Sequence, residues 1–457
     1  MKGKRYNLRF KFIKIFTVSL LLFLFAVNPA AQPQEYFFEK TFDGESLSEY
    51  AGIEGIPDIS GYSAYVYNPE TGSVIYRKNQ EDIVYPASTV KLMTAIVAYE
   101  NIPDLSTEIT ATTTAVRATK GSNMALKIGE QLTAEQLLYG LLVTGANDAA
   151  NLLAEHVAGS IDKFCEMMNE KAKELGANDT FYVNPTGLHD ERMKTTARDT
   201  AIIANYFYYI NQLFEMSDTT RYTIPETEYT QQRILLNRNL LISRVRSEKY
   251  YYSPAMGMSL GNTPEAGDCI VSSCSDESGM TYICIIMNSR NESEENAACA
   301  DAVALMKMCL SNFTYSKVLS PKNIICEIPV KLAVDTDYVT LLPEKELKAL
   351  LPKNLDYSKD ITIEPRVSED YAIAPIYEGV KYGEAVVKYK NEISIGTVSL
   401  VAGKSVDKSN VLYFIDRAEQ LILGRWFRVF AICSVVLLLA YFAASVAFVS
   451  KRRKRRR

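Results

Sequence analysis

Ser88 and Lys91 stand three positions apart in the segment PASTVKLMTAIVA, residues 86–98. On a helix, residues three apart are neighbours on one face, so the hydroxyl and the amine would lie side by side. The rest of the segment is apolar on nearly every side, and a buried ammonium without a partner tends to lose its proton. A neutral lysine can act as the base that turns a serine hydroxyl into a nucleophile. One hypothesis is therefore a nucleophilic serine with an adjacent lysine base.

The Ser-x-x-Lys spacing by itself is weak evidence, because this chain contains it three times. The other two pairs, Ser160 with Lys163 and Ser405 with Lys408, lie in polar surroundings that would keep the lysine solvated and charged. Only the first pair has an apolar helix that would desolvate its lysine. The alternative is an ordinary first helical turn in which Lys91 reaches out to water. On the spacing alone that alternative is the better interpretation, so the wider sequence has to decide.

Hydrophobic periodicity predicts the elements that would position this pair. Two alternating runs around Asn68, Pro69 and Gly72 indicate a hairpin, and two more about a turn at 277–279 indicate a second one. Beyond residue 321 the sequence changes to short strand-like runs broken by turn residues, which indicate a separate all-β module of roughly 90 residues. Helical patterns cover residues 86–100, 133–158, 161–175 and 294–311, the third ending at Gly176, and a polar-faced helix is expected from Asn410.

Both ends of the chain carry membrane signals. Six basic residues within positions 1–14 precede the apolar stretch Ile15–Val27 and then small residues, which is the layout of a secretory signal peptide, with an uncleaved anchor as the alternative. Val429–Val449 is a 21-residue stretch without a charge, and KRRKRRR follows it at once. That stretch is long enough to span a bilayer, and basic residues favour the cytoplasmic side. The sequence predicts a single-pass protein of the cell membrane whose main part is extracytoplasmic.

The predicted exported part is acidic. Removing the 13 basic residues at the two ends leaves 37 basic against 54 acidic residues, a net charge of −17, which argues against nucleic acid as a partner. The eight cysteines show no metal spacing, and the chain has only two histidines, His156 and His189. We therefore expect neither a metal site nor a cofactor. One or two disulfides among the seven cysteines outside the predicted span stay open.

A family resemblance is carried by three segments, PASTVKLMTAIVAYE, GSNMALKIGEQLTAEQLLYGLLVTGANDAANLLAE and MNEKAKELGANDTFYVNPTGLHD. They resemble the D-alanyl-D-alanine carboxypeptidases, low-molecular-mass penicillin-binding proteins of serine peptidase type. The order and spacing match from about residue 58 to 310, and APIYEGVKYGEAVVKYKNEISIGTVSLVAG is similar to the family's C-terminal β domain. The resemblance implies an α+β domain of the β-lactamase/transpeptidase-like fold, an antiparallel sheet flanked by helices, followed by a small all-β domain and a C-terminal transmembrane helix.

The resemblance also implies a reaction. In the family a serine attacks the bond between two terminal D-alanines of a peptidoglycan stem peptide, an acyl-enzyme forms, and water releases the shortened stem. β-Lactam antibiotics such as penicillins mimic this substrate and trap the serine. The predicted organisation is a signal peptide (1–31), a linker (32–57), a carboxypeptidase-like domain (58–318), a β domain (319–410), a juxtamembrane segment (411–428), a transmembrane helix (429–449) and a basic cytoplasmic tail (450–457).

The family's first motif, Ser-x-x-Lys, is intact here, which implies Ser88 as the nucleophile and Lys91 as its base. The second motif, Ser-x-Asn, is altered, because alignment on Asn147 puts Gly145 where the family has its serine, and a proton-shuttling hydroxyl is missing. Thr144 lies one position earlier, about 100° around a helix, and would need a local rearrangement to substitute. Asn147 is expected to orient the substrate or the lysine, with a capping or turn asparagine as the alternative.

The third motif, Lys-Thr-Gly on a strand, is replaced by Ser259, Leu260 and Gly261. Gly261 would still let a substrate backbone come close, or would mark a bulge in the strand. We expect Ser259 and Gly261, together with Gly145, to contact the substrate. The lost lysine would have donated a charge-assisted hydrogen bond worth about 1.5 to 3 kcal/mol, which corresponds to roughly ten- to more than a hundredfold in rate or affinity.

Four arginines are candidates to replace that charge, and the sequence does not choose among Arg198, Arg238, Arg244 and Arg246. Two functions from different classes follow. The first is a membrane-anchored serine carboxypeptidase with an altered pocket, and the second is a noncatalytic relative that binds peptidoglycan or a cell-wall partner. A β-lactamase would share the motifs, but the added β domain and the anchor argue against it.

Overall fold

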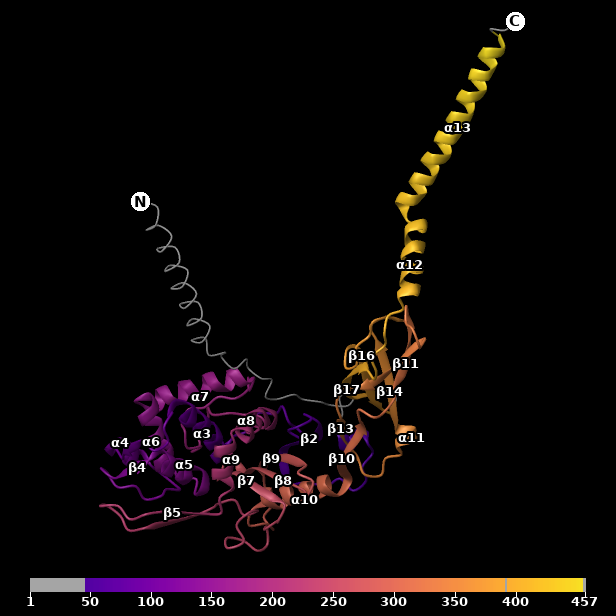
Figure 1. Cartoon of the computed structure of the whole chain (residues 1–457). Coiled ribbons are helices and arrows are strands. Elements are labelled where there is room, and N and C mark those ends of the chain that lie inside the picture. Colours follow the sequence, from indigo (N-terminus) through magenta and orange to yellow (C-terminus); the bar gives the residue numbers. More distant parts are fainter. Residues whose placement is uncertain (1–45, 391–392, 455–457) are drawn as a thin grey trace, which may run out of the picture. The chain divides into compact units, whose positions relative to one another are not determined.

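The computed structural model describes residues 46–390 and 393–454 (Figure 1). The chain divides into two compact units, with the boundary between Thr314 and Tyr315. The predicted signal peptide, residues 1–31, and positions 32–45 of the predicted linker lie outside the described residues. The domain boundaries derived from the sequence stay predictions.

The first unit is built on a five-stranded antiparallel sheet with the order β2-β1-β9-β8-β7. Both predicted hairpins are confirmed, since β1 pairs with β2 and β8 pairs with β9. The edge strand β7 carries the altered third motif. The strands are β1 (Gly61–Tyr67), β2 (Val74–Lys78), β7 (Ala255–Thr263), β8 (Gly267–Ser275) and β9 (Thr281–Ser289).

The sheet is buried on both faces, because successive side chains of a strand point to opposite sides. On one face Tyr65, Val271 and Ile285 belong to a core shared with helices of the same unit. The alternate residues along the strands, such as Ile270 and Ile286, point to the other face. They are also fully buried, and α10 (Ala297–Asn312) covers them. An antiparallel sheet flanked by helices is the predicted architecture.

Helices α3 to α9 pack on the face of the sheet opposite α10, with α3 at their centre. Its residues from Val90 to Ala98 are all buried, so a helix that is apolar all round does lie inside the unit. The other elements are α2 (Leu47–Tyr50), η1 (Ala87–Thr89), α3 (Val90–Asn101), α4 (Thr113–Ala118), α5 (Ala134–Val143), α6 (Asn147–Ala158), α7 (Ile161–Leu175), α8 (Ala197–Tyr209), α9 (Asn211–Asp218), and the strand pairs β3 (Glu108–Thr110) with β4 (Gln131–Thr133) and β5 (Arg221–Ile224) with β6 (Arg233–Leu236).

The helical pattern at 133–158 predicts one helix, and this prediction is wrong. Helix α5 ends at Val143 and α6 begins at Asn147, with Gly145 between them at a φ of +65°. A side chain at this φ is strained, which is why a glycine can break the helix here. The break lies at the altered second motif, Gly145 to Asn147. Helix α7 does end at Gly176, as predicted, with that glycine in the left-handed conformation.

The second unit contains a six-stranded sheet with the order β14-β16-β17-β12-β11-β15 and a separate pair, β10 with β13. The predicted all-β module is therefore present. Its elements are β10 (Phe313–Leu319), β11 (Cys326–Lys331), β12 (Tyr338–Pro343), β13 (Leu347–Pro352), α11 (Tyr357–Asp360), β14 (Ile361–Val367), β15 (Ala372–Ile373), β16 (Lys381–Tyr389) and β17 (Ile393–Ala402).

Two helices end the described chain. The predicted helix from Asn410 is α12 (Asn410–Leu423), whose apolar residues are exposed. Helix α13 (Arg425–Lys454) contains a 24-residue stretch, Arg425–Phe448, with a mean hydropathy of 2.5 and no part of it buried. By length and composition this stretch is able to cross a bilayer.

All eight cysteines lie among the described residues and are free thiols. The sequence left one or two disulfides open, and the structure contains none among these eight. Six of the cysteines are buried, and burial raises the pKa of Cys269 to about 12. A buried thiol with a raised pKa behaves as a small apolar group, so these cysteines contribute to packing.

Candidate active site

The serine and the lysine of the first motif come together at the start of α3. Ser88 lies in the short 3-10 turn η1, and Lys91 lies in the first turn of α3. The Lys91 Nζ donates a hydrogen bond to the Ser88 Oγ, 3.0 Å away, and a second one to the backbone oxygen of Thr186. Lys91 is 3% exposed, so its side chain does not reach out to water. The alternative of an ordinary surface turn is therefore wrong.

Two causes lower the pKa of Lys91 well below its usual value of 10.5. The larger is burial, because the ammonium loses its hydration inside the apolar helix layer. The second is the positive charge of Arg238. Burial and the charge of Arg246 in turn lower the pKa of Arg238. The site thus holds a lysine that is disposed to be neutral, with a lone pair available to take the proton of Ser88.

Two glycines let neighbouring segments come close to the nucleophile. Gly187 has a φ of +80°, and a Cβ there would overlap the carbonyl oxygen of Ala87. A Cβ at Gly261, on β7, would lie 2.5 Å from the backbone nitrogen of Ser88. Gly261 is therefore required by the close approach of β7 to η1. The bulge interpretation of this glycine is not needed, since the register shift in β7 lies between Met256 and Ser259.

The third motif contacts the nucleophile's backbone. The Ser259 Oγ donates a hydrogen bond of 3.0 Å to the backbone oxygen of Ser88. Leu260 lines the pocket beside Met258 and carries no polar group. The strand thus supplies a neutral contact and an apolar wall where the family has a cation and a hydroxyl.

The second motif places Asn147 as the first residue of α6, buried beneath the loop of residues 119–130. Its Nδ2 donates to the backbone oxygen of Lys120 at 2.6 Å, and its backbone N–H donates to that of Ser122 at 2.8 Å. Its Oδ1 is buried and has no hydrogen-bond partner among the described residues. The cap position belongs to Ala146, so the capping alternative for Asn147 is wrong. Thr144 donates its hydroxyl to the Gly140 oxygen at 2.8 Å.

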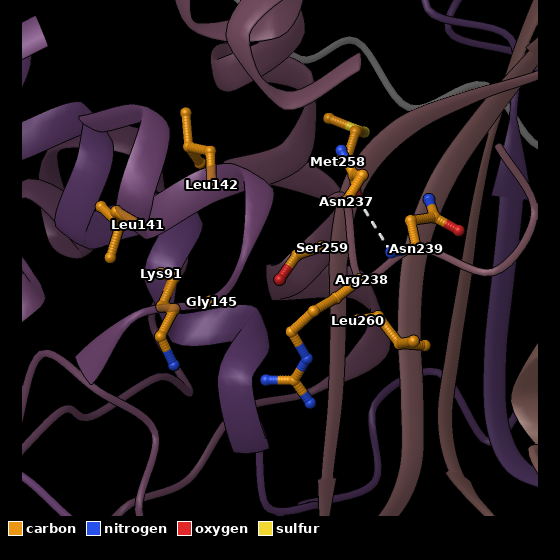
Figure 2. A pocket seen from close by; sticks show the side chains of 10 residues that line it. All are labelled: Lys91, Leu141, Leu142, Gly145, Asn237, Arg238, Asn239, Met258, Ser259 and Leu260. Atoms are coloured by element: carbon orange, nitrogen blue, oxygen red, sulfur yellow. Dashed lines mark hydrogen bonds between the residues drawn. The ribbon is translucent and has the colours of Figure 1, made fainter. Parts of the chain in front are cut away.

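Arg238 is the arginine that lines the pocket. Figure 2 shows its guanidinium group and the Lys91 amine projecting into the same pocket, with Gly145 and Ser259 in its wall. The other three candidates are engaged elsewhere: Arg198 with Glu81 at 3.6 Å, Arg244 with Glu248 at 3.9 Å, and Arg246 with the Leu236 oxygen at 3.5 Å. Of the four candidates, Arg238 is therefore the one that lines the pocket.

The side chain of Arg238 fills the space beside Gly145. A Cβ at position 145 would lie 2.8 Å from the Arg238 Nη1 and 3.1 Å from its Cδ, so a serine there cannot coexist with this arginine conformation. The Nη1 donates instead to the Ser122 Oγ at 3.1 Å. The guanidinium thus occupies the space that a side chain at position 145 would need.

Comparison with known proteins decides the family. The model of the D-alanyl-D-alanine carboxypeptidase family matches residues 51–291, more than half of the chain. The chain belongs to this family. Its enzyme class is that of a serine-type carboxypeptidase, and the resemblance inferred from the sequence is confirmed.

Individual relatives agree with the family assignment. The chain is 26% identical to D-alanyl-D-alanine carboxypeptidase DacF of Bacillus subtilis over 392 residues, which cover 84% of this chain and 92% of that protein. It is 24% identical to DacA of Haemophilus influenzae over 81% of this chain and 88% of that one. The crystal structure of penicillin-binding protein 5 from the same organism superposes with a TM-score of 0.60 at 23% identity, over 77% of this chain and 99% of that one. This last likeness confirms the predicted transpeptidase-like fold.

Several pocket residues were missed by the sequence analysis. Asn237 and Asn239 flank Arg238 and line the pocket, as do Leu141 and Leu142 at the end of α5. Asn237 fixes its segment by donating to the backbone oxygens of Ser217 and Thr219, each at 2.9 Å. An arginine between two asparagines, directly after a strand-like run, was the available signal.

Proposed function

We propose that this member of the family is a membrane-anchored D-Ala-D-Ala carboxypeptidase that acts on peptidoglycan stem peptides through an acyl-enzyme on Ser88. The observation that carries the proposal is the buried Lys91 amine, 3.0 Å from the Ser88 hydroxyl. A lysine in an apolar helix costs stability, and a protein that only keeps the fold has no use for it.

In the proposed reaction neutral Lys91 takes the proton of Ser88 while the Oγ attacks the carbonyl carbon of the penultimate D-alanine. The backbone N–H of Ser88, which lies close to Gly261, would stabilise the negative charge that develops on the carbonyl oxygen. Lys91 then returns the proton to the leaving amine, and D-alanine departs. Water attacks the ester in the second half of the reaction and frees Ser88.

Arg238 is proposed to hold the terminal carboxylate of the substrate. It is the guanidinium that lines the pocket, and it faces the apolar wall that Leu260 and Met258 make. A charge-assisted bond from it would replace the one that Ser259 cannot make. The same chemistry allows a β-lactam, which also carries a carboxylate, to enter and acylate Ser88.

The membrane part of the proposal rests on α13. The described chain has one helix long and apolar enough to cross a bilayer, Arg425–Phe448, and basic residues follow it. With the basic end in the cytoplasm, both folded units would lie on the extracytoplasmic side.

A second candidate function is a noncatalytic relative that binds peptidoglycan or a cell-wall partner. The observation in its favour is that Asn147 turns its amide nitrogen to Lys120, and that Gly145 supplies no hydroxyl. The site would then bind a stem peptide without cleaving it.

The decisive experiment uses the full chain in detergent micelles. Its intact mass is measured before and after exposure to a penicillin, and D-alanine release is measured from a synthetic peptide ending in D-Ala-D-Ala. The expected result is a penicillin adduct and D-alanine release, both absent in Ser88→Ala. A folded wild-type protein with neither would exclude the enzyme and favour the binding protein.

A further inference from the structure

A buried ion pair lies outside the pocket, between the loop of residues 119–130 and the hairpin of β5 and β6. The side chain of Glu130 is 0% exposed, and its Oε1 lies 2.5 Å from the Arg233 Nη2. The hydroxyls of Thr227 and Thr230 donate to the same oxygen at 3.0 and 2.9 Å, and the backbone N–H of Lys127 donates to Oε2 at 3.1 Å. The carboxylate is thus fully satisfied by groups from two segments.

One of these segments leads into Arg238, which lines the pocket, and the other carries Ser122, the hydrogen-bond partner of Arg238. Arg233 is the first residue of β6, and the chain runs directly from the end of β6 into Asn237 and Arg238. The Arg233 Nη1 also donates to the backbone oxygen of Met124 at 3.2 Å. Met124 lies two residues from Ser122, whose hydroxyl accepts a hydrogen bond from Arg238. The ion pair therefore holds β6, the strand that leads to Arg238, against the loop that carries Ser122, the hydrogen-bond partner of Arg238.

A purely stabilising role explains this pair poorly. A buried ion pair adds little net stability, because desolvation of both charges offsets their attraction, and an apolar pair of similar volume is often as stable. What a buried pair with fixed hydrogen bonds does provide is a defined position for the segments that carry it. Here the segments so fixed are those that bring Arg238 beside Gly145 and toward Lys91.

We propose that Glu130 and Arg233 are a positioning pair that holds Arg238 against the Gly145 gap and beside Lys91, and that they thereby set the reactivity of Ser88. This inference rests on the proposed function. The pair touches no substrate itself and acts through Arg238. Among the described residues, the charged group that acts on Lys91 is Arg238, and the one that acts on Arg238 is Arg246.

The test replaces the pair by apolar residues in the full chain, Glu130→Leu with Arg233→Met, so that no unpaired charge is left buried. The rate of acylation by a penicillin is followed by intact mass from pH 6 to pH 10, and folding is checked by urea unfolding. The expected result is a roughly ten- to hundredfold slower acylation, since a small misplacement of a site group has effects of this size. The rising limb of the pH profile should also move to higher pH, because Lys91 loses a nearby positive charge.

A control is the ion pair of Lys171 with Glu100, whose Nζ and Oε1 are 2.9 Å apart between α7 and α3 and whose side chains are 10% and 29% exposed. Lys171→Met with Glu100→Leu should change stability without moving the pH profile. Arg233→Lys, which keeps the charge, should restore part of the rate.

The outcomes separate this inference from the proposed function. A wild-type adduct together with an unshifted profile in the folded Glu130/Arg233 variant overturns the inference alone. No adduct on the folded wild-type protein overturns the proposed function, and the positioning role falls with it.

Discussion

At the scale of single residues, the Ser88–Lys91 pair of the first motif is held together, and the nearby positive charge comes from Arg238. The family's third-motif cation would lie on β7, but here Ser259 makes a neutral contact to the backbone of Ser88. The positive group is Arg238, which enters from another segment through the space that Gly145 leaves. This conformation of Arg238 depends on the absence of a side chain at position 145.

Arg238→Ala is expected to weaken substrate capture and to change its pH dependence. Loss of a charge-assisted hydrogen bond costs about 1.5 to 3 kcal/mol, so kcat/KM for a D-Ala-D-Ala peptide should fall roughly ten- to a hundredfold. Since Arg238 lowers the pKa of Lys91, its removal raises that pKa, and the rising limb of the acylation profile should move to higher pH. Arg244→Ala, which removes an exposed arginine paired with Glu248, is the control and should change neither quantity.

Lys91→Met is expected to make the protein inactive but more stable. At pH 7 the buried lysine lowers the free energy of unfolding, and an apolar side chain of similar length should raise it by on the order of 1 kcal/mol. Between the lowered native pKa of Lys91 and the usual value of 10.5, the unfolded chain binds more protons, so wild-type stability rises with pH. The gain from the substitution should therefore shrink from pH 7 to pH 10, as measured by urea unfolding.

The matched control for this change is Lys163→Met, at the exposed lysine of a second Ser-x-x-Lys pair. Its stability difference should be small and independent of pH. An equal pH dependence in both variants would contradict a lowered pKa at Lys91.

At the scale of elements, two backbone segments approach the turn that carries Ser88 so closely that only glycine fits at the points of contact. Gly187 and Gly261 bring the segment after Thr186 and the strand β7 against η1, so the turn carrying Ser88 is enclosed from two directions. The break between α5 and α6 puts Asn147 at the start of α6, where it bonds to the backbone oxygens of Lys120 and Ser122. The sequence pattern showed helices and hairpins, but it did not show these close approaches, because they depend on which backbones meet.

Gly187→Ala is expected to cost far more stability than Gly176→Ala. Both glycines have a positive φ, where a side chain costs roughly 1 to 2 kcal/mol. At Gly176 nothing lies within 4 Å of the added Cβ, whereas at Gly187 it would overlap the backbone of Ala87. Thermal unfolding should show a small loss for the first variant and a loss several times larger for the second. Similar losses would mean that conformation alone, and not the approach to η1, explains Gly187.

At the scale of the whole molecule, the chain joins a carboxypeptidase-type unit, a β unit and a terminal apolar helix. The β unit has its own sheet and its own buried residues, among them Val339, Leu341 and Leu400. Helix α12 exposes apolar side chains such as Phe414, which is 78% exposed, directly before the candidate span. An exposed apolar surface next to a bilayer-spanning stretch is consistent with a protein whose C-terminal end lies at a membrane.

Replacing Leu437, Leu438 and Leu439 by arginine is expected to release the protein from membranes. Each charge in the middle of a span costs about 2.5 to 3.5 kcal/mol by insertion scales, so three of them should abolish insertion. After alkaline extraction, the wild-type chain should stay in the membrane pellet and the variant should appear in the supernatant. Arginine at three exposed positions of the β unit, Val334, Ile373 and Val380, serves as the control. Retention of the triple span variant in the pellet would count against α13 as the anchor.

The sequence by itself determined the family, the first motif and the order of the elements. Periodicity and local spacing specify helices, hairpins and an apolar span, and Ser88 and Lys91 are close in the chain as well as in space. The tertiary structure alone decided which arginine faces the site, where the α5–α6 pattern breaks, and why Gly145 and Gly261 have no side chains. These features depend on packing between segments distant in sequence, Arg238 against Gly145 and β7 against η1, and no local pattern records such contacts.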